Sequence, residues 1–126
     1  MAITHNTATR NVLADAVDAA INTGSGTATL VIKDGASVSA TINLQNPAFG
    51  AASGGTITLA GVTLSATASG TVADADGFDI EDRDGTVILS GTVTATSGGG
   101  DIELDNTNIA SGQSVAITAL TYSAPA

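Results

Sequence analysis

The stretch that decides the fold runs from Asp84 to Tyr122. It reads Asp84-Gly-Thr-Val-Ile-Leu-Ser-Gly-Thr-Val-Thr-Ala-Thr-Ser-Gly-Gly-Gly100, then Asp101-Ile-Glu-Leu-Asp-Asn-Thr-Asn-Ile-Ala-Ser-Gly112, then Gln113-Ser-Val-Ala-Ile-Thr-Ala-Leu-Thr-Tyr122. Strand-forming Val, Ile and Thr alternate with small polar residues, and Gly, Asp and Asn interrupt them where tight turns are expected. The pattern predicts short antiparallel strands. It contains no nucleophile with a positioned base, so a structural role is favoured over an enzymatic one.

The rest of the chain after its first quarter follows the same pattern. The two Asp-Gly pairs, at Asp34 and Asp84, are strong signals for two-residue hairpin turns, and Gly91 inside a long apolar run predicts a bulge or a close backbone approach. About eight short strands predict a mainly β fold, a β-sandwich or barrel-like antiparallel sheet over 27–122. The expected strands are 27–33, 37–44, 56–60, 62–69, 78–83, 86–96, 101–104 and a closing strand over 113–122.

One helix is expected, over residues 7–21. Asn6 or Thr7 can cap its start, and Gly24 suits its end. Apolar residues recur at helical spacing while Asp15 and Asp18 point elsewhere. This apolar face either covers one side or end of the chain's own sheet or contacts a neighbouring subunit. It consists of Val12, Leu13, Ala16, Val17, Ala20 and Ile21.

The composition predicts one domain, residues 1–126, with an unusual core. Aromatic residues are 2% of the chain, so Val, Ile, Leu and Ala must supply most of the buried volume. Such a domain should gain stability from assembly with neighbours. The residues expected at partner contacts are Ile3, His5, Arg10, Val12, Leu13, Phe49 and Tyr122.

The formal charge of −9 excludes two common partners. Nucleic-acid surfaces need clustered Lys and Arg, and anionic membranes need a basic face, whereas this chain has three basic residues. Nine of the twelve acids lie between Asp74 and Asp105. So many carboxylates cannot be buried unpaired, so this region should face solvent or a basic patch on a partner. The chain has no cysteine, which excludes disulfides and thiolate metal sites.

Two features could in principle carry chemistry. The acidic run from Asp74 to Asp84 could hold a weakly bound divalent cation, but its spacing is not that of an EF-hand loop, and alternation along a strand would separate the carboxylates. A glycoside hydrolase site is disfavoured because aromatic platforms are scarce. His5 is the only histidine, and it is expected to be solvated. The run is therefore expected to form turns and a solvated face, with no catalytic, cofactor-binding or metal-binding residue assigned.

The N-terminal segment, residues 1–10, has no obvious place in the sandwich. It lacks the basic and apolar regions of a secretion signal. It contains Arg10, one of the few cations, which is expected to pair with a carboxylate. We therefore expect an ordered arm that contacts a partner protein or an adjacent subunit.

Two blocks resemble small virion structural proteins of tailed bacteriophages, and together they cover about half of the chain. The first is His5-Asn-Thr-Ala-Thr-Arg-Asn-Val-Leu-Ala-Asp-Ala-Val-Asp-Ala-Ala-Ile21, and the second is the stretch quoted above. The loop Asn46-Pro-Ala-Phe-Gly-Ala-Ala-Ser53 is also similar. The resemblance carries no catalytic residues.

That resemblance implies a virion structural role, which fits a small, acidic, β-rich chain. The expected function is capsid decoration, in which a cement protein stabilises the outside of the phage head after assembly in the host cytoplasm. The expected partners are the major capsid protein and other copies of the chain, as a trimer. The alternative is a tail- or fibre-associated virion protein, or a sandwich that forms tail-tube rings.

Overall fold

The computed structural model describes residues 3–125 and confirms the mainly β fold. Within that range there are one helix and nine strands. Their bounds are α1 Thr7–Ile21, β1 Thr29–Asp34, β2 Ser37–Asn43, β3 Thr56–Thr58, β4 Leu64–Thr67, β5 Gly77–Glu81, β6 Val87–Ala95, β7 Ile102–Leu104, β8 Ser114–Ile117 and β9 Thr121–Ser123. In the same range, no helix combines the length and the apolar character needed to cross a membrane.

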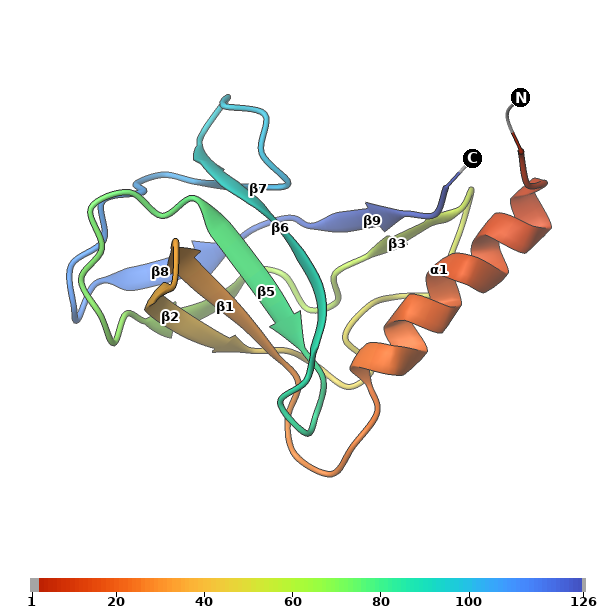
Figure 1. Ribbon diagram of the computed structural model, residues 1–126, viewed down its shortest axis with the longest axis horizontal. Coiled ribbons are helices and arrows are strands. Elements are labelled where there is room, and N and C mark those ends of the chain that lie inside the picture. The colour runs from red at the N-terminus through yellow and green to blue at the C-terminus, as the bar shows by residue number, and fades with distance from the viewer. Residues whose placement is uncertain (1–2, 126) are drawn as a thin grey trace.

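The main sheet is a curled half-barrel (Figure 1). Its strand order is β2-β1-β5-β6-β7, and its pairs are antiparallel except for the parallel pair β6–β7. The β4–β8 pair lies beside β2, because the carbonyl of Ser39 accepts hydrogen bonds from the amides of Ser69 and Gly70 at 2.8 and 3.0 Å. A third pair, β3–β9, extends away from the half-barrel toward the helix (Figure 1).

The positive φ expected of the glycines in the two Asp-Gly turns is confirmed, but the two-residue turn predicted at Asp84 is wrong. Glu81 pairs with Val87 and the Asp82 amide donates to the Thr86 carbonyl, so the turn spans residues 82–86. After β1 the pair Asp34–Ser37 leaves Gly35 and Ala36 as the two turn residues. Gly35 and Gly85 adopt φ of +57° and +90° in the turns after β1 and β5, a conformation that glycine adopts without steric cost. Gly91 marks a close approach, since a Cβ there would lie 2.5 Å from the Phe78 ring and 2.7 Å from the Asp101 carboxylate.

The predicted closing strand over 113–122 is wrong. It is two strands that belong to different pairs, because β8 pairs with β4 and β9 pairs with β3. Leu120 is buried although the alternation that begins at Val115 and Ile117 would expose it. The three residues between β8 and β9 carry the chain from one two-stranded sheet to the other. They are residue types that are common in strands, so the sequence gives no turn signal where the chain crosses between the sheets.

The core is built mainly from aliphatic side chains, as the composition predicted. Phe49 and Phe78 are the buried aromatic residues, at 1% and 2% exposure. Ser39 differs from the aliphatic core residues because its side chain is polar. It is fully buried, and its hydroxyl has no hydrogen-bond partner within the described residues. The isoleucines with 1% exposure or less are Ile21, Ile32, Ile42, Ile57, Ile80, Ile102, Ile109 and Ile117.

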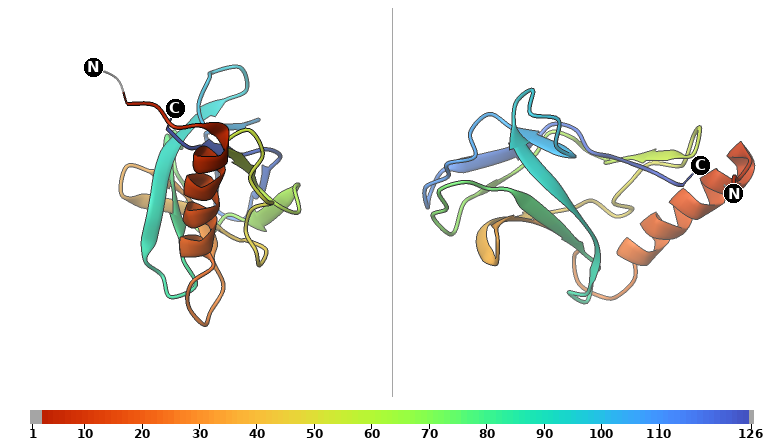
Figure 2. Two further views of the ribbon diagram at one scale, coloured as in Figure 1. Left: turned by 90° about the vertical axis from the view of Figure 1, so that its right-hand side faces the viewer. Right: turned by 45° about the horizontal axis from the view of Figure 1, so that its top comes forward.

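Helix α1 has the predicted bounds, and the side chain of Asn6 caps it by accepting a 2.8 Å hydrogen bond from the Thr9 amide. It lies at one end of the molecule, against β3 and the loop that precedes it (Figures 1 and 2). Ala14 and Ile21 are its buried residues. The helix therefore covers an end of the fold rather than the five-stranded sheet.

Candidate interaction surface

Helix α1 is attached to the domain through a row of polar side chains. Residues 11, 15, 18 and 22 follow helical spacing, so they lie along one side of the helix. Each accepts a hydrogen bond from a backbone amide of the loop between β2 and β3, which runs antiparallel to the helix. The pairs are Asn11–Gly55 at 2.7 Å, Asp15–Ala52 at 2.9 Å, Asp18–Phe49 at 3.0 Å and Asn22–Ala48 at 2.9 Å. We call these four bonds the polar row.

Gly55 joins three segments at the N-terminal end of the polar row. Its amide donates to Asn11, and its carbonyl accepts a 2.8 Å hydrogen bond from the Ala124 amide. Arg10 donates from Nη2 to the Ala124 carbonyl at 3.1 Å. The expected pairing of Arg10 with a carboxylate is therefore wrong within the described residues, because the C-terminal strand brings a backbone carbonyl to the guanidinium.

The opposite side of α1 has the reverse polarity. Val12 and Leu13 are 67% and 36% exposed, and Ala16 and Ala19 are also exposed. The charged side chains of the helix are turned toward the rest of the chain: Asp15 and Asp18 bond the loop and Arg10 bonds Ala124. Viewed from this end, the helix lies in front of the other described segments (Figure 2, left). We call the uncharged side the outward face; it consists of Thr9, Val12, Leu13, Ala16, Ala19 and Ala20.

This arrangement divides the apolar face expected from the sequence. Val17 and Ile21 pack against the core, whereas Val12, Leu13 and Ala16 do not. The polar row was missed because Asp15 and Asp18 were expected only to point away from apolar contacts. The signal that could have revealed it is the helical spacing of four Asn and Asp residues, all of which can accept amide hydrogen bonds.

The other expected contact residues fall into different environments. Ile3 is 76% exposed and His5 is also exposed, whereas Tyr122 and Arg10 are half-buried. Phe49 is wrong as a contact residue, because its ring is in the chain's own core and its backbone bridges to Leu59 in an antiparallel β-bridge.

The expected arm over residues 1–10 is shorter than predicted. Residues 7–10 form the first turn of α1, so among the described residues only 3–6 precede the helix. Met1 and Ala2 lie outside the described residues.

Carboxylates of the acidic region order loops. Asp82 accepts from the amides of Asp84 and Thr86, both at 2.9 Å, in the turn between β5 and β6. Glu103 accepts from the amides of Ser97 and Gly99 at 3.2 and 3.1 Å. Each carboxylate serves a different turn, and no group of three or more His, Asp or Glu within residues 3–125 is placed to hold a metal ion.

Asp79 is held by side chains from two neighbouring strands. The Ser90 hydroxyl donates to one carboxylate oxygen at 2.6 Å, and Lys33 pairs with the other at 3.0 Å. The Ser90 hydrogen bond, followed by the hydrogen bond and charge of Lys33, lowers the pKa of Asp79 below its ordinary 3.8 despite the opposing effect of burial. This trio joins three strands of the main sheet.

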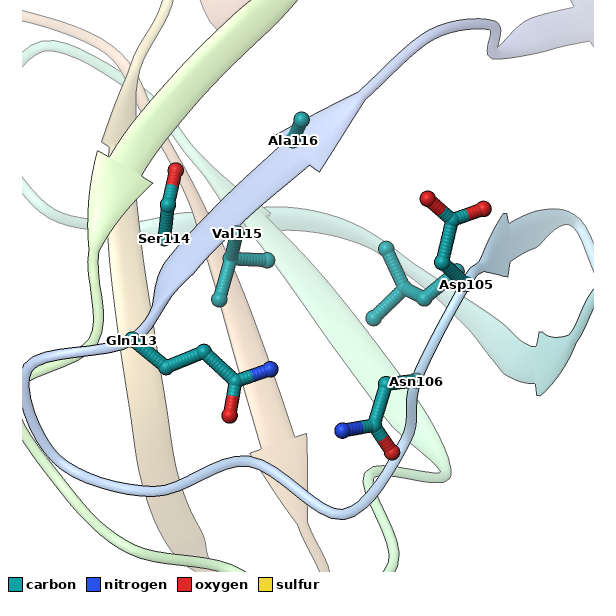
Figure 3. A pocket seen from close by; sticks show the side chains of 7 residues that line it. Asp105, Asn106, Gln113, Ser114, Val115 and Ala116 are labelled. Carbon is teal, nitrogen blue, oxygen red and sulfur yellow. The ribbon is translucent and has the colours of Figure 1, made fainter.

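Two hollows lie at the seams between strands. The larger, of about 220 Å³, lies between β8 and the segment that follows β7 (Figure 3). The amides of Asn106 and Gln113 point toward each other across it, Val115 lies beside them, and the Asp105 carboxylate points away. The second, of about 100 Å³, lies between β6 and β9 and includes Leu89 and Tyr122 in its lining. Each lining contains one carboxylate, Asp105 or Asp101, so neither hollow brings together a pair of carboxylates for acid–base chemistry.

No protein-family model matches this chain, and neither a curated protein nor a solved structure matches it. The outward face of α1 is accordingly the candidate site that the geometry itself singles out.

Proposed function

We propose that this protein is a non-enzymatic structural protein of a bacteriophage virion, a capsid decoration protein. In this proposal it binds the major capsid protein on the outside of the head as a homo-oligomer, a trimer. The resemblance of the N-terminal and C-terminal blocks to small virion proteins of tailed phages supports the assignment. The observation that carries it is the outward face of α1, which presents Val12 and Leu13 on a helix held by side-chain hydrogen bonds.

A rigid apolar face suits a protein whose work is to add contacts. Burying a large aliphatic side chain contributes about 1.5–3 kcal/mol, and a surface that is already ordered loses little conformational entropy when it binds. The polar row and the Arg10–Ala124 hydrogen bonds fix the helix before any partner arrives. Val12 and Leu13 can therefore contribute to binding without first ordering the helix.

The charge distribution supports the same role. A chain with a net charge of −9 repels other copies in solution, which opposes uncontrolled aggregation of free protein. The outward face is free of charge, so it can approach an apolar partner without leaving an ion buried.

Virion binding tests the proposal directly. Purified protein would be added to virions of the encoding phage that lack it, and bound copies would be counted by quantitative gel analysis. We expect saturable binding by the wild type and about tenfold or greater weakening by Val12→Asp, which corresponds to a loss of roughly 1.4 kcal/mol. Val38→Asp is the matched control, because Val38 is also an exposed valine, at 42%, but lies on β2.

A reconstruction of the decorated virion decides between head and tail. Added density on the outside of the head would support decoration. Density along the tail or fibres would contradict the decoration role and would support the alternative, a tail- or fibre-associated structural protein. No binding of wild-type protein to either part would overturn the virion role.

A further inference from the structure

We propose that the edges of β6 and β9 form a docking site for an extended, basic segment of a partner protein, which pairs with them as an added strand. The proposal goes beyond the proposed function, because it concerns a second surface and a second kind of contact. The half-barrel is open on one side, along which the chain runs from β8 to β9 (Figure 1). The hollow of about 100 Å³ lies on this side, between β6 and β9, and we call it the seam hollow. Its lining includes Phe49, Phe78, Leu89, Ser90, Leu120 and Thr121.

The backbone of β6 is unpaired on one side over part of its length. The Val93 amide donates to the Asp76 carbonyl of the β5 side at 3.0 Å. Because antiparallel bonds alternate along a strand, Leu89 faces β5 and the backbone of Ser90 faces away from it. β7 pairs only with the last three residues of β6 and does not reach Ser90. Within the described residues, the Ser90 amide and carbonyl therefore have no hydrogen-bond partner.

β9 has a matching open edge across the seam hollow. The Leu120 carbonyl accepts a 2.9 Å hydrogen bond from the Leu59 amide, on the side of β3. The same alternation turns the Thr121 amide and carbonyl away from β3, and neither has a partner within the described residues. Ser90 and Thr121 are both exposed and both line the seam hollow. Open edges of this kind bind an extended peptide, because its N–H and C=O groups supply the missing partners.

The open part of β6 lacks two features that normally prevent strand pairing. Free edges are usually protected by charged residues or proline. Residues 87–91 include neither, and Val87 is 49% exposed. The opposite edge of the main sheet, at β2, is covered instead, because the Ser39 carbonyl accepts from the amides of the segment after β4. The edge of β6 is therefore the one suited to an added strand.

The seam hollow specifies an aliphatic side chain in that strand. The nearly buried Phe49 and Phe78 lie in its lining together with Leu89 and Leu120. Its volume of about 100 Å³ is below the roughly 150 Å³ of a cavity that holds benzene, so it suits one branched aliphatic side chain. A residue level with Leu89 on the added strand would point to the same face of the sheet and into the hollow.

Asp101 specifies a basic residue two positions from the aliphatic one. Its carboxylate accepts from the amide and the hydroxyl of Thr92 at 2.9 and 3.1 Å, at the end of the open edge. A Cβ on Gly91 would meet both the Phe78 ring and this carboxylate, so the carboxylate and the seam hollow share one face of β6. Side chains two positions apart on a strand also share a face. The acidic region 74–105, which includes β5, β6 and β7, attracts the same basic segment at longer range.

A short peptide tests the site on the full-length protein. The probe is Lys-Thr-Ile-Thr-Lys with an acetylated start and an amidated end, titrated into isotope-labelled protein and followed by NMR. We expect saturable shifts of the Ser90 and Thr121 amides with a Kd of about 1 mM or lower. Replacing the isoleucine of the peptide by alanine should weaken binding about tenfold, because less apolar surface is buried. N-methylation of its three central residues should weaken binding about fivefold or more, because backbone donors are lost.

Two protein variants separate the charge at the site from the charge of the whole chain. Asp101→Asn removes the charge but keeps an oxygen that can accept from Thr92, and it should weaken binding by about two- to fivefold. Asp105→Asn is the matched control, because it removes the same charge beside the other hollow, from which its carboxylate points away (Figure 3). Binding of the peptide to Asp105→Asn should equal binding to the wild type.

The outcomes that overturn the docking site are distinct from those that overturn the virion role. No saturable shift of the Ser90 and Thr121 amides at about 5 mM peptide would overturn the site. Equal affinity for the isoleucine and alanine peptides, or equal weakening by Asp101→Asn and Asp105→Asn, would overturn it as well, because attraction to the net charge would then account for the binding. Selective peptide binding at these edges by a protein that does not bind virions would support the docking site and overturn the virion role.

Discussion

Asp18 and Phe49, which are 31 residues apart in the sequence, meet in a 3.0 Å hydrogen bond from the Phe49 amide to the Asp18 carboxylate. The same residue that donates this amide places its ring in the core, where it is 1% exposed. One residue thus connects the helix to the hydrophobic interior. Because the orientation of α1 is fixed by such bonds, the direction in which its outward face points is fixed as well.

Removing this acceptor should loosen the helix. We expect Asp18→Ala to lower the free energy of unfolding by about 1–3 kcal/mol, because the Phe49 amide would lose its partner in a half-buried site. Asp18→Asn should cost less than half of that, since the amide oxygen of Asn can still accept. Urea denaturation followed by circular dichroism measures both. Equal losses for the two variants would contradict the role of Asp18 as an acceptor.

The helix and the hairpins were predictable because local residues determine them. Asn6 caps α1 from within the same turn, and the glycines that follow Asp34 and Asp84 supply the positive φ that both turns need. The length of the second turn, residues 82–86, was not predicted, because it depends on the register in which β5 pairs with β6. The split between β8 and β9 was not predictable, since it depends on which distant strands, β4 and β3, offer a free edge.

The interaction surface was predictable only in part. Val12 and Leu13 were expected at a partner contact, and the structure shows that both are exposed. Which of the apolar residues of the helix face inward could not be read from hydrophobicity alone, because the polar row makes part of the inward contact beside Ala14, Val17 and Ile21. That outcome depends on the path of the loop from Ala48 to Gly55. The backbone amides of this loop need hydrogen-bond acceptors, which apolar side chains cannot supply.

Gly55 should resist substitution for two separable reasons. Its φ is +79°, and an added Cβ would lie 2.7 Å from the Arg10 guanidinium carbon. Gly55→Ala should therefore cost about 1–2 kcal/mol for the backbone conformation plus a further loss from the displaced Arg10. Gly35→Ala is the matched control, because its φ is +57° but a Cβ there meets nothing within 4 Å. Thermal unfolding should rank Gly55→Ala below Gly35→Ala, and Arg10→Ala should remove most of the difference; equal melting temperatures would contradict this.

The Asp79 trio predicts a stability change at low pH. The lowered pKa of Asp79 means that the folded state favours the ionised carboxylate. The stabilisation that ionised Asp79 gives the folded state is thus fully present above the ordinary pKa of 3.8. It is lost as the pH falls through the lowered pKa. Asp79→Asn should reduce stability at pH 7, and its difference from the wild type should shrink below about pH 4.

Both partners of Asp79 should contribute to its lowered pKa. The Ser90 hydrogen bond is the largest single cause, and Lys33 acts through a hydrogen bond and its charge, so Ser90→Ala and Lys33→Met should each raise the pKa of Asp79. Carboxyl chemical shifts in an NMR titration report both values. An unchanged pKa of Asp79 in Ser90→Ala would contradict the role of the Ser90 hydroxyl.

Ser39 offers a stabilising substitution in the core. Its side chain is fully buried on β2, and its hydroxyl has no hydrogen-bond partner within the described residues, although its carbonyl accepts from Ser69 and Gly70. Burying a hydroxyl without a partner costs about 1–3 kcal/mol. Ser39→Ala removes that cost and leaves the backbone bonds between β2 and the segment that follows β4 in place, so we expect the free energy of unfolding to rise by about 1 kcal/mol. Ser90→Ala is the matched control, because that hydroxyl is bonded to Asp79 and its loss should destabilise the protein. Denaturant unfolding of the two alanine variants should therefore give changes of opposite sign, and a loss of stability in Ser39→Ala would show that the hydroxyl is bonded after all.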